Sequence, residues 1–141
     1  MGFCRGFLSA SLEDPSLALL YLAFPIAMSD DVQSSFSETN SRTGFLAWLN
    51  RYPEIRFGLV SRVEASIPFV SDSIRLGVSS RALVLTERGL VGLGSDAPAK
   101  VYADRLPTEA RQVIRRAERL GIWMAGAGTV GSIFSAFGVL P

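Results

Sequence analysis

The stretch from Pro68 to Gly94 constrains the fold more than any other part of this 141-residue chain. Its first half has the apolar spacing of a helix, and its second half has two short apolar segments separated by residues 86–89. Gly89 can adopt the positive φ that a tight hairpin turn requires. A helix followed by a β-hairpin at about residues 82–93 is the sequence outline of a winged helix. Winged helices bind DNA or other proteins with the same architecture, so the outline predicts a scaffold and no particular activity.

Apolar residues at helical spacing predict helices over most of the rest of the chain. Residues 15–28 are apolar on almost every side, so they predict a central, buried helix in which Pro25 makes a kink or a break. A second long pattern begins near Pro53 and continues to about residue 66. Pro68 disfavours the helical conformation of the residue before it, which predicts a helix boundary at this point.

Two segments have no clear helical pattern. Residues 1–13 are expected to form an irregular N-terminal arm, and residues 94–106, with Gly, Ser, Asp and Pro, are expected to form a loop. The length of the chain corresponds to one domain. We therefore expect a mainly α fold, a helical domain with a winged-helix-like core, over residues 1–141.

Residues that carry out common enzyme chemistry are scarce. The chain contains one cysteine, Cys4, and no histidine. These counts exclude a disulfide within the chain, a Cys/His metal site, and nucleophiles activated by histidine. Asp30 and Asp31 are adjacent carboxylates, but they follow Ser29 where a helix dipole favours negative charge, so a helix start explains them better than acid–base chemistry. We expect no catalytic, metal-binding or cofactor-binding residue, and no small-molecule substrate.

One motif has the spacing of a dinucleotide-binding fingerprint. Residues 126–131 read G-x-G-x-x-G, but the fingerprint also needs a strand before it and a second strand that ends in an acidic residue about 20 positions on. No acidic residue follows Glu118. The motif is better explained as a helix stop and a new helix start, with Thr129 as the N-cap and Gly138 as the end of the last helix.

The balance of apolar and charged residues favours a surface that a partner covers. Hydrophobic residues make up 48% of the chain, and the mean hydropathy is +0.30, which is high for a free-standing domain of this size. The longest apolar run, residues 17–28, is shorter than the roughly 20 residues that a membrane-spanning helix needs. The formal net charge is +1, so no global field favours nucleic acid. We expect a cytoplasmic protein with no membrane contact.

Three arginines recur at four-residue spacing in the helix expected over about residues 106–124. Arg111, Arg115 and Arg119 therefore lie together on the side opposite its apolar stripe. Like charges at this spacing repel one another, which favours an anionic partner. A solvated face moderated by Glu118 is the interpretation that we favour.

Short segments distributed along the chain form a specific combination. They are residues 37–43 (SETNSRT), 45–49 (FLAWL), 52–54 (YPE), 120–125 (LGIWMA), 128–130 (GTV), 133–134 (IF) and 138–141 (GVLP). In order and in spacing they resemble the middle component of three-component ABC systems, and the resemblance spans most of the chain.

The resemblance implies a small, non-catalytic accessory subunit. Its implied partners are an SMC-like ABC ATPase and an effector subunit, often a nuclease, and Lamassu-type anti-phage defence is the best-known setting. Contact with DNA would then occur only through the complex. A winged-helix DNA-binding transcriptional regulator is the alternative function. The candidate interface residues are Thr39, Asn40, Arg42, Trp48, Arg111, Arg115 and Arg119. The stretch from Thr39 to Arg42 is either a contact surface or a helix cap.

Overall fold

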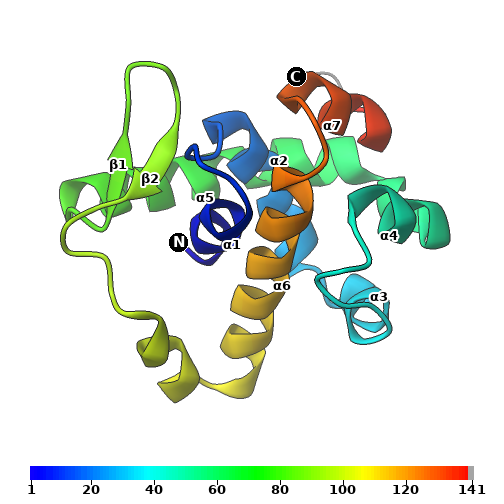
Figure 1. The fold of residues 1–141 in the computed structure, drawn as a ribbon, viewed down its shortest axis with the longest axis horizontal. Helices are drawn as coiled ribbons and strands as arrows, with labels where there is room; N and C mark the ends of the chain where they lie inside the picture. The colour runs from blue at the N-terminus through cyan, green and yellow to red at the C-terminus, as the bar shows by residue number, and fades with distance from the viewer. Residues whose placement is uncertain (140–141) are drawn as a thin grey trace.

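The computed structural model describes residues 1–139, and these form a mainly helical fold with one antiparallel β-hairpin (Figure 1). The expected mainly α fold is therefore confirmed. The α-helices are α1 (Gly2–Ala10), α2 (Leu17–Met28), α3 (Gln33–Ser37), α4 (Phe45–Arg51), α5 (Leu59–Ser79), α6 (Thr108–Ala125) and α7 (Val130–Phe137). The strands are β1 (Leu83–Leu85) and β2 (Val91–Leu93), and the short 3-10 helices are η1 (Asp30–Val32), η2 (Pro53–Arg56) and η3 (Lys100–Arg105).

The β-hairpin follows α5 directly, as the sequence predicts. Leu83 pairs with Leu93 and Leu85 pairs with Val91, while Gly89 takes a φ of 75° in the turn. The segment between α1 and α2 adds to the hairpin, because the amide of Val91 donates to the carbonyl of Pro15 at 2.9 Å. These contacts attach the hairpin to the body of the protein through the start of α2.

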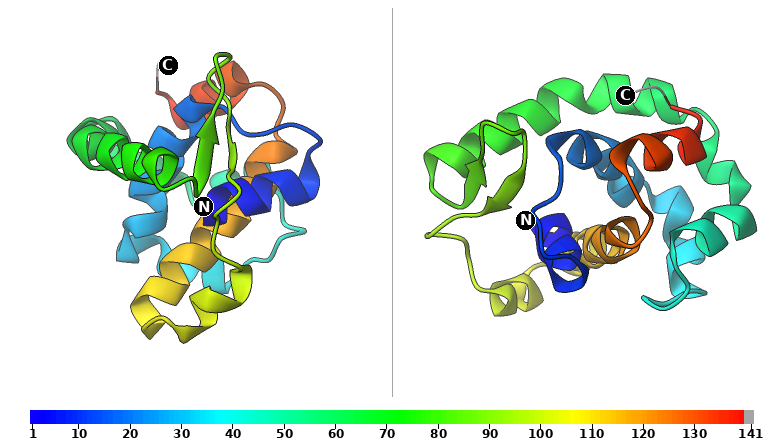
Figure 2. Two further views of the ribbon diagram at one scale, coloured as in Figure 1. Left: turned by 90° about the vertical axis from the view of Figure 1, so that its left-hand side faces the viewer. Right: turned by 45° about the horizontal axis from the view of Figure 1, so that its top comes forward.

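The N-terminal segment is a helix, so the prediction of an irregular arm over residues 1–13 is wrong. Helix α1 lies against α6, and both views in Figure 2 show the two helices side by side. Glycines make this close approach possible: a Cβ at Gly6 would lie 1.9 Å from the carbonyl oxygen of Glu118, and one at Gly121 would lie 2.3 Å from that of Phe3. Glycine has low helix propensity, so the same residues that allow the packing weaken the sequence signal for the helix.

Helix α5 continues through Pro68, so the predicted boundary at that residue is also wrong. The helix runs as one long element along the body of the protein (Figure 2). Pro68 removes one backbone hydrogen bond, but Pro68 and Glu64 are both exposed, so water can reach the carbonyl that loses its partner. Val70 and Ile74, beyond the proline, are buried, and the contact of α5 with α2 favours continuation of the helix.

The segment expected to be a loop over residues 94–106 contains the 3-10 helix η3. Val101 and Tyr102 are exposed there, at 57% and 53%. The segment is attached to the body by polar contacts, because Arg5 of α1 donates to the carbonyl of Pro98 and the Nζ of Lys100 lies 3.3 Å from a carboxylate oxygen of Glu118. Its apolar side chains therefore remain at the surface.

The start of the last helix agrees with the interpretation of the glycine motif. The hydroxyl oxygen of Thr129 accepts a hydrogen bond from the amide of Ser132 at 3.1 Å, which caps α7. Gly138 follows the helix at a φ of 72°, as expected for a helix end. Both predictions about these residues are confirmed.

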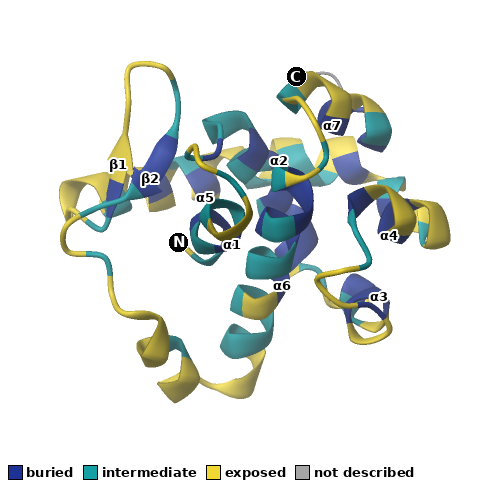
Figure 3. Ribbon diagram, viewed as in Figure 1, coloured by how far each residue is buried: buried dark blue, intermediate teal, exposed yellow. Residues whose placement is uncertain are grey.

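An aromatic cluster occupies the core between α3, α4, α6 and α7, each of which has buried stretches beside exposed ones (Figure 3). The rings of Trp48 and Trp123 lie 5.0 Å apart, and Phe36 stacks on Trp123 at 5.6 Å. Phe45 and Phe137 complete the cluster edge to face, at 5.2 Å. Contacts of this kind add to the free energy of burial and connect four helices around one centre.

We expect the thiol of Cys4 to be unreactive in the folded protein. Cys4 has no exposed surface and packs against Leu83 and Val91. Burial raises the pKa of this thiol above its usual value, which reduces the thiolate form that reacts. Modification by Ellman's reagent at about pH 8 should be more than about tenfold slower in buffer than in urea. Equal rates in the two conditions would contradict the buried position of Cys4.

Candidate protein-binding surfaces

A large apolar groove lies between α2, α5 and the pair formed by α1 and α6. Its volume is about 510 Å³. Leu20 and Phe24 of α2, Val70 and Leu76 of α5, and Ile114 of α6 are among the residues that line it. A concave surface of this size with almost no polar groups is typical of a binding site for an apolar group.

Large apolar side chains are exposed on two flanks of α5. Phe69 at 62% and Leu76 at 69% lie on one flank, while Val60 at 47%, Ile67 at 44% and Val78 at 40% lie on the opposite one. Phe69 and Leu76 extend the apolar surface of the groove, because Leu76 lines it and the ring of Phe69 lies beside that of Phe24 in its lining.

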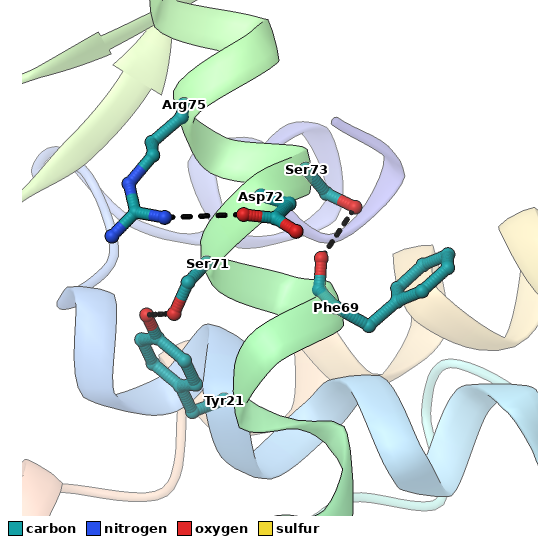
Figure 4. A network of polar contacts seen from close by, with 6 residues as sticks. All are labelled: Tyr21, Phe69, Ser71, Asp72, Ser73 and Arg75. Atoms are coloured by element: carbon teal, nitrogen blue, oxygen red, sulfur yellow. Dashed lines mark hydrogen bonds and ion pairs between the residues drawn. The ribbon is translucent and has the colours of Figure 1, made fainter.

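Polar groups along α5 are paired with one another and with α2. Figure 4 shows Tyr21 of α2 pointing toward Ser71, and the two hydroxyl groups are hydrogen bonded at 2.6 Å. On the exposed side, the guanidinium of Arg75 donates to the carboxylate of Asp72 at 3.1 Å. The polar contacts hold α5 in place beside α2 and leave the neighbouring apolar side chains available to a partner.

The arginines of α6 do not all lie on a solvated face. The guanidinium of Arg119 donates to the carbonyls of Phe36 and Thr39, the second at 2.8 Å, and lies over the rings of Phe36 and Trp123 at 5.9 Å from each. Burial lowers the pKa of Arg119 below its usual value. Arg115 is exposed, and Arg111 is partly exposed and donates to the hydroxyl of Thr108 at 3.1 Å.

Arg116 is a functional candidate that the analysis of the sequence missed. It is only 3% exposed, and its Nε donates to the carbonyl of Ala27 at 2.8 Å. One further nitrogen donates to Gln33, and another lies 3.6 Å from the carboxylate of Asp30. Arginine is rarely buried, and nothing in the four-residue spacing of the other arginines distinguishes this one, so the sequence offered no signal for it.

Two of the candidate interface residues have buried side chains. Trp48 has no exposed surface, and its indole N–H donates to the hydroxyl of Ser35 at 3.1 Å. Thr39 is 8% exposed and donates to the carbonyl of Ser35 at 2.6 Å, which closes the end of α3. In this structure both side chains belong to the core and do not form an exposed contact surface.

Asn40 and Arg42 are exposed in a turn between α3 and α4. The side-chain oxygen of Asn40 accepts from the amide of Arg42 at 2.8 Å, and its backbone carbonyl accepts from the indole N–H of Trp123 at 3.1 Å. The N-cap of α4 is Gly44, with no side-chain cap, so the stretch from Thr39 to Arg42 does not cap that helix.

Two basic residues near the hairpin are paired with acids, whereas the exposed Arg88 in the hairpin turn makes no ion pair among residues 1–139. Arg75 is paired with Asp72, and Arg81 lies 3.1 Å from the carboxylate of Asp96. Paired guanidinium groups are less available to phosphates, so this geometry does not favour the DNA-binding alternative. Within residues 1–139, no three His, Cys, Asp or Glu side chains lie close enough together to hold a metal ion.

Among residues 1–139, no single helix has the length and apolar content needed to cross a membrane. Helices α6 and α7 meet the requirement together, but they are bent by 117° at the break between them.

The fold and its surfaces define a small helical domain with an apolar groove and a separate cluster of arginines. A family model described as ABC-three component (ABC-3C) system Middle Component 3 matches residues 1–141. The chain therefore belongs to this family of middle components, and as one component of a multi-component system it has protein partners. No curated protein and no solved structure matches the chain.

Proposed function

We propose that this protein is a non-catalytic accessory subunit that binds an SMC-like ABC ATPase in the cytoplasm. It helps hold or regulate an effector subunit, a nuclease in kind, within an anti-phage defence complex of the Lamassu type. The apolar groove between α2, α5 and α6 is the observation that supports this proposal most strongly, because such a surface in a middle component is expected to receive a partner.

The groove has the chemistry of the centre of a protein interface. Stable interfaces bury roughly 1,200–2,000 Å² and have an apolar, aromatic-rich centre with a polar rim. The ring centroids of Phe24 and Phe69 lie 5.4 Å apart at the junction of α2 and α5. The exposed ion pair of Arg75 and Asp72 also lies on α5. Each exposed apolar side chain that a partner buries fully there contributes at most about 1.5–3 kcal/mol.

We expect the substitution Leu76→Glu to disrupt the complex with the ABC ATPase. Leu76 lines the groove and is 69% exposed, so glutamate is tolerated in the free protein but places a charge in the interface. The matched control is Leu46→Glu, because Leu46 is 59% exposed on α4 and does not line the groove. Co-purification of each variant with the co-expressed ATPase of the same system measures the effect.

Loss of the ATPase from the Leu76→Glu preparation, with retention by Leu46→Glu, is the expected result. If both variants retained the ATPase equally, the groove would not be its binding surface. If the unsubstituted protein did not co-purify with the ATPase, the proposed function itself would be wrong.

A further inference from the structure

A second hollow, separate from the apolar groove, lies between α3 and α6. Its volume is about 180 Å³, and we call it the basic pocket. It is lined by Gln33, Phe36, Ser37, Gln112, Arg115, Arg116 and Arg119. Three guanidinium groups thus line one small hollow, and no carboxylate is among the lining residues.

The positive charge of Arg116 is poorly compensated. Its side chain is 3% exposed, and its partners at Ala27 and Gln33 are uncharged oxygens. Its Nη2 has no hydrogen-bond partner, and the carboxylate of Asp30 lies 3.6 Å away with 97% of its side chain exposed. Arg116 is therefore a buried cation whose one ion-pair partner, Asp30, makes no hydrogen bond with it, so it adds positive potential to the pocket.

The other two arginines add charge without adding a counter-ion. Arg119 donates to the carbonyl oxygens of Phe36 and Thr39 and makes no ion pair among residues 1–139. Arg115 is exposed at the pocket and likewise has no carboxylate within ion-pair distance in the described part of the chain. The contacts of Arg116 and Arg119 with carbonyls fix both guanidinium groups in place, so the pocket is organised before an anion binds.

We propose that the basic pocket binds the carboxylate of a single Asp or Glu side chain from a protein partner. Arginine forms forked, charge-assisted hydrogen bonds with carboxylates. The exposed guanidinium of Arg115 and the N–H groups of Arg119 that do not donate to Phe36 and Thr39 supply the donors, while Arg116 adds buried positive charge beside them. This inference rests on the proposed function, since it states the chemistry of a partner that the accessory subunit binds.

The surroundings of the pocket favour a protein carboxylate over the phosphates of DNA. Duplex DNA needs a row of cations that follows its backbone, whereas these arginines surround a single hollow. Asp30 and Asp31 precede α3, and Glu38 follows it, and all three are exposed. Exposed carboxylates at both ends of α3 repel a polyanion more strongly than they repel a single acidic side chain.

The test uses the full chain and two synthetic peptides blocked at both ends. One peptide carries a single glutamate among glycine and serine residues, and the other carries glutamine at the same position. Binding is followed by NMR through the side-chain N–H signals of Arg115, Arg119 and Trp123. We expect saturable shifts with the glutamate peptide and none with the glutamine peptide.

Substitution of Arg115, the exposed arginine of the basic pocket, tests whether the peptide binds in that pocket. Arg115→Gln should weaken binding of the glutamate peptide about tenfold, because charge-assisted hydrogen bonds are lost. Arg75→Gln, at an exposed arginine on α5 outside the pocket, should leave binding unchanged. Arg115 is exposed and has no ion pair in the described residues, so its replacement should not affect folding.

Three results would overturn the inference. They are equal shifts with both peptides, equal weakening in the two variants, and tighter binding of a short duplex DNA or of inorganic phosphate through the same side chains. Any of these would leave co-purification with the ATPase intact, so a failure here is distinguishable from a failure of the proposed function.

Discussion

Replacing Gly6 by alanine should destabilise the protein by about 3 kcal/mol or more, because the added methyl group has no space. The new Cβ would lie 1.9 Å from the carbonyl oxygen of Glu118, and backbone atoms of α6 cannot move aside as a side chain can. Alanine has higher helix propensity than glycine, by about 0.8–1.0 kcal/mol, so any loss of stability must come from the packing of α1 on α6. Urea unfolding followed by circular dichroism measures the change.

The same crossing can be tested from the other helix. Gly121→Ala places a Cβ 2.3 Å from the carbonyl oxygen of Phe3 and should have an effect of the same size. Gly131→Ala is the matched control, because Gly131 lies in α7 and its nearest neighbour would be 3.9 Å away. The control should be neutral or slightly stabilising. If Gly6→Ala were as stable as Gly131→Ala, α1 would not pack on α6 as described.

The second large effect is expected at Trp48. Trp48→Ala should lower the free energy of unfolding by about 3–5 kcal/mol, since it removes a fully buried aromatic side chain. It also leaves the hydroxyl of Ser35 without the indole donor that lies 3.1 Å away. Leu46→Ala, at an exposed position on the same helix, should change stability by less than about 0.5 kcal/mol. Thermal and urea unfolding measure both variants.

This comparison also distinguishes the two roles considered for Trp48. A residue that contacts a partner from the surface would lose binding on substitution and keep the stability of the free protein. Substitution of a core residue instead lowers the stability of the free protein, because the free protein itself unfolds more easily. Unchanged stability of Trp48→Ala would contradict its position in the aromatic cluster.

The predictions that succeeded rest on local rules. The hairpin around Gly89 and the cap formed by Thr129 depend on residues a few positions apart, so the sequence alone was sufficient to place them. The family resemblance also drew on short motifs, and the match over residues 1–141 confirms the family of middle components.

The predictions that failed depend on contacts between distant segments. Gly6 lowers helix propensity locally and yet lies in a helix, because α6 packs closely against it. Pro68 disfavours the helical conformation of the residue before it, but the packing of α5 against α2 outweighs that cost. Arg116 bonds to Ala27 across the fold, and no sequence period reports such a contact. The residues that line the apolar groove and the basic pocket could therefore be identified only from the structure.

The most direct test of the proposed function is reconstitution of the complex with and without this protein. The ABC ATPase and the effector of the same system are purified separately, and their association is measured by size-exclusion chromatography with light scattering. We expect the effector to elute with the ATPase only when this chain is present, and to be lost when Leu76→Glu replaces it. Stable association of ATPase and effector in the absence of the chain would contradict its role as the subunit that holds them together.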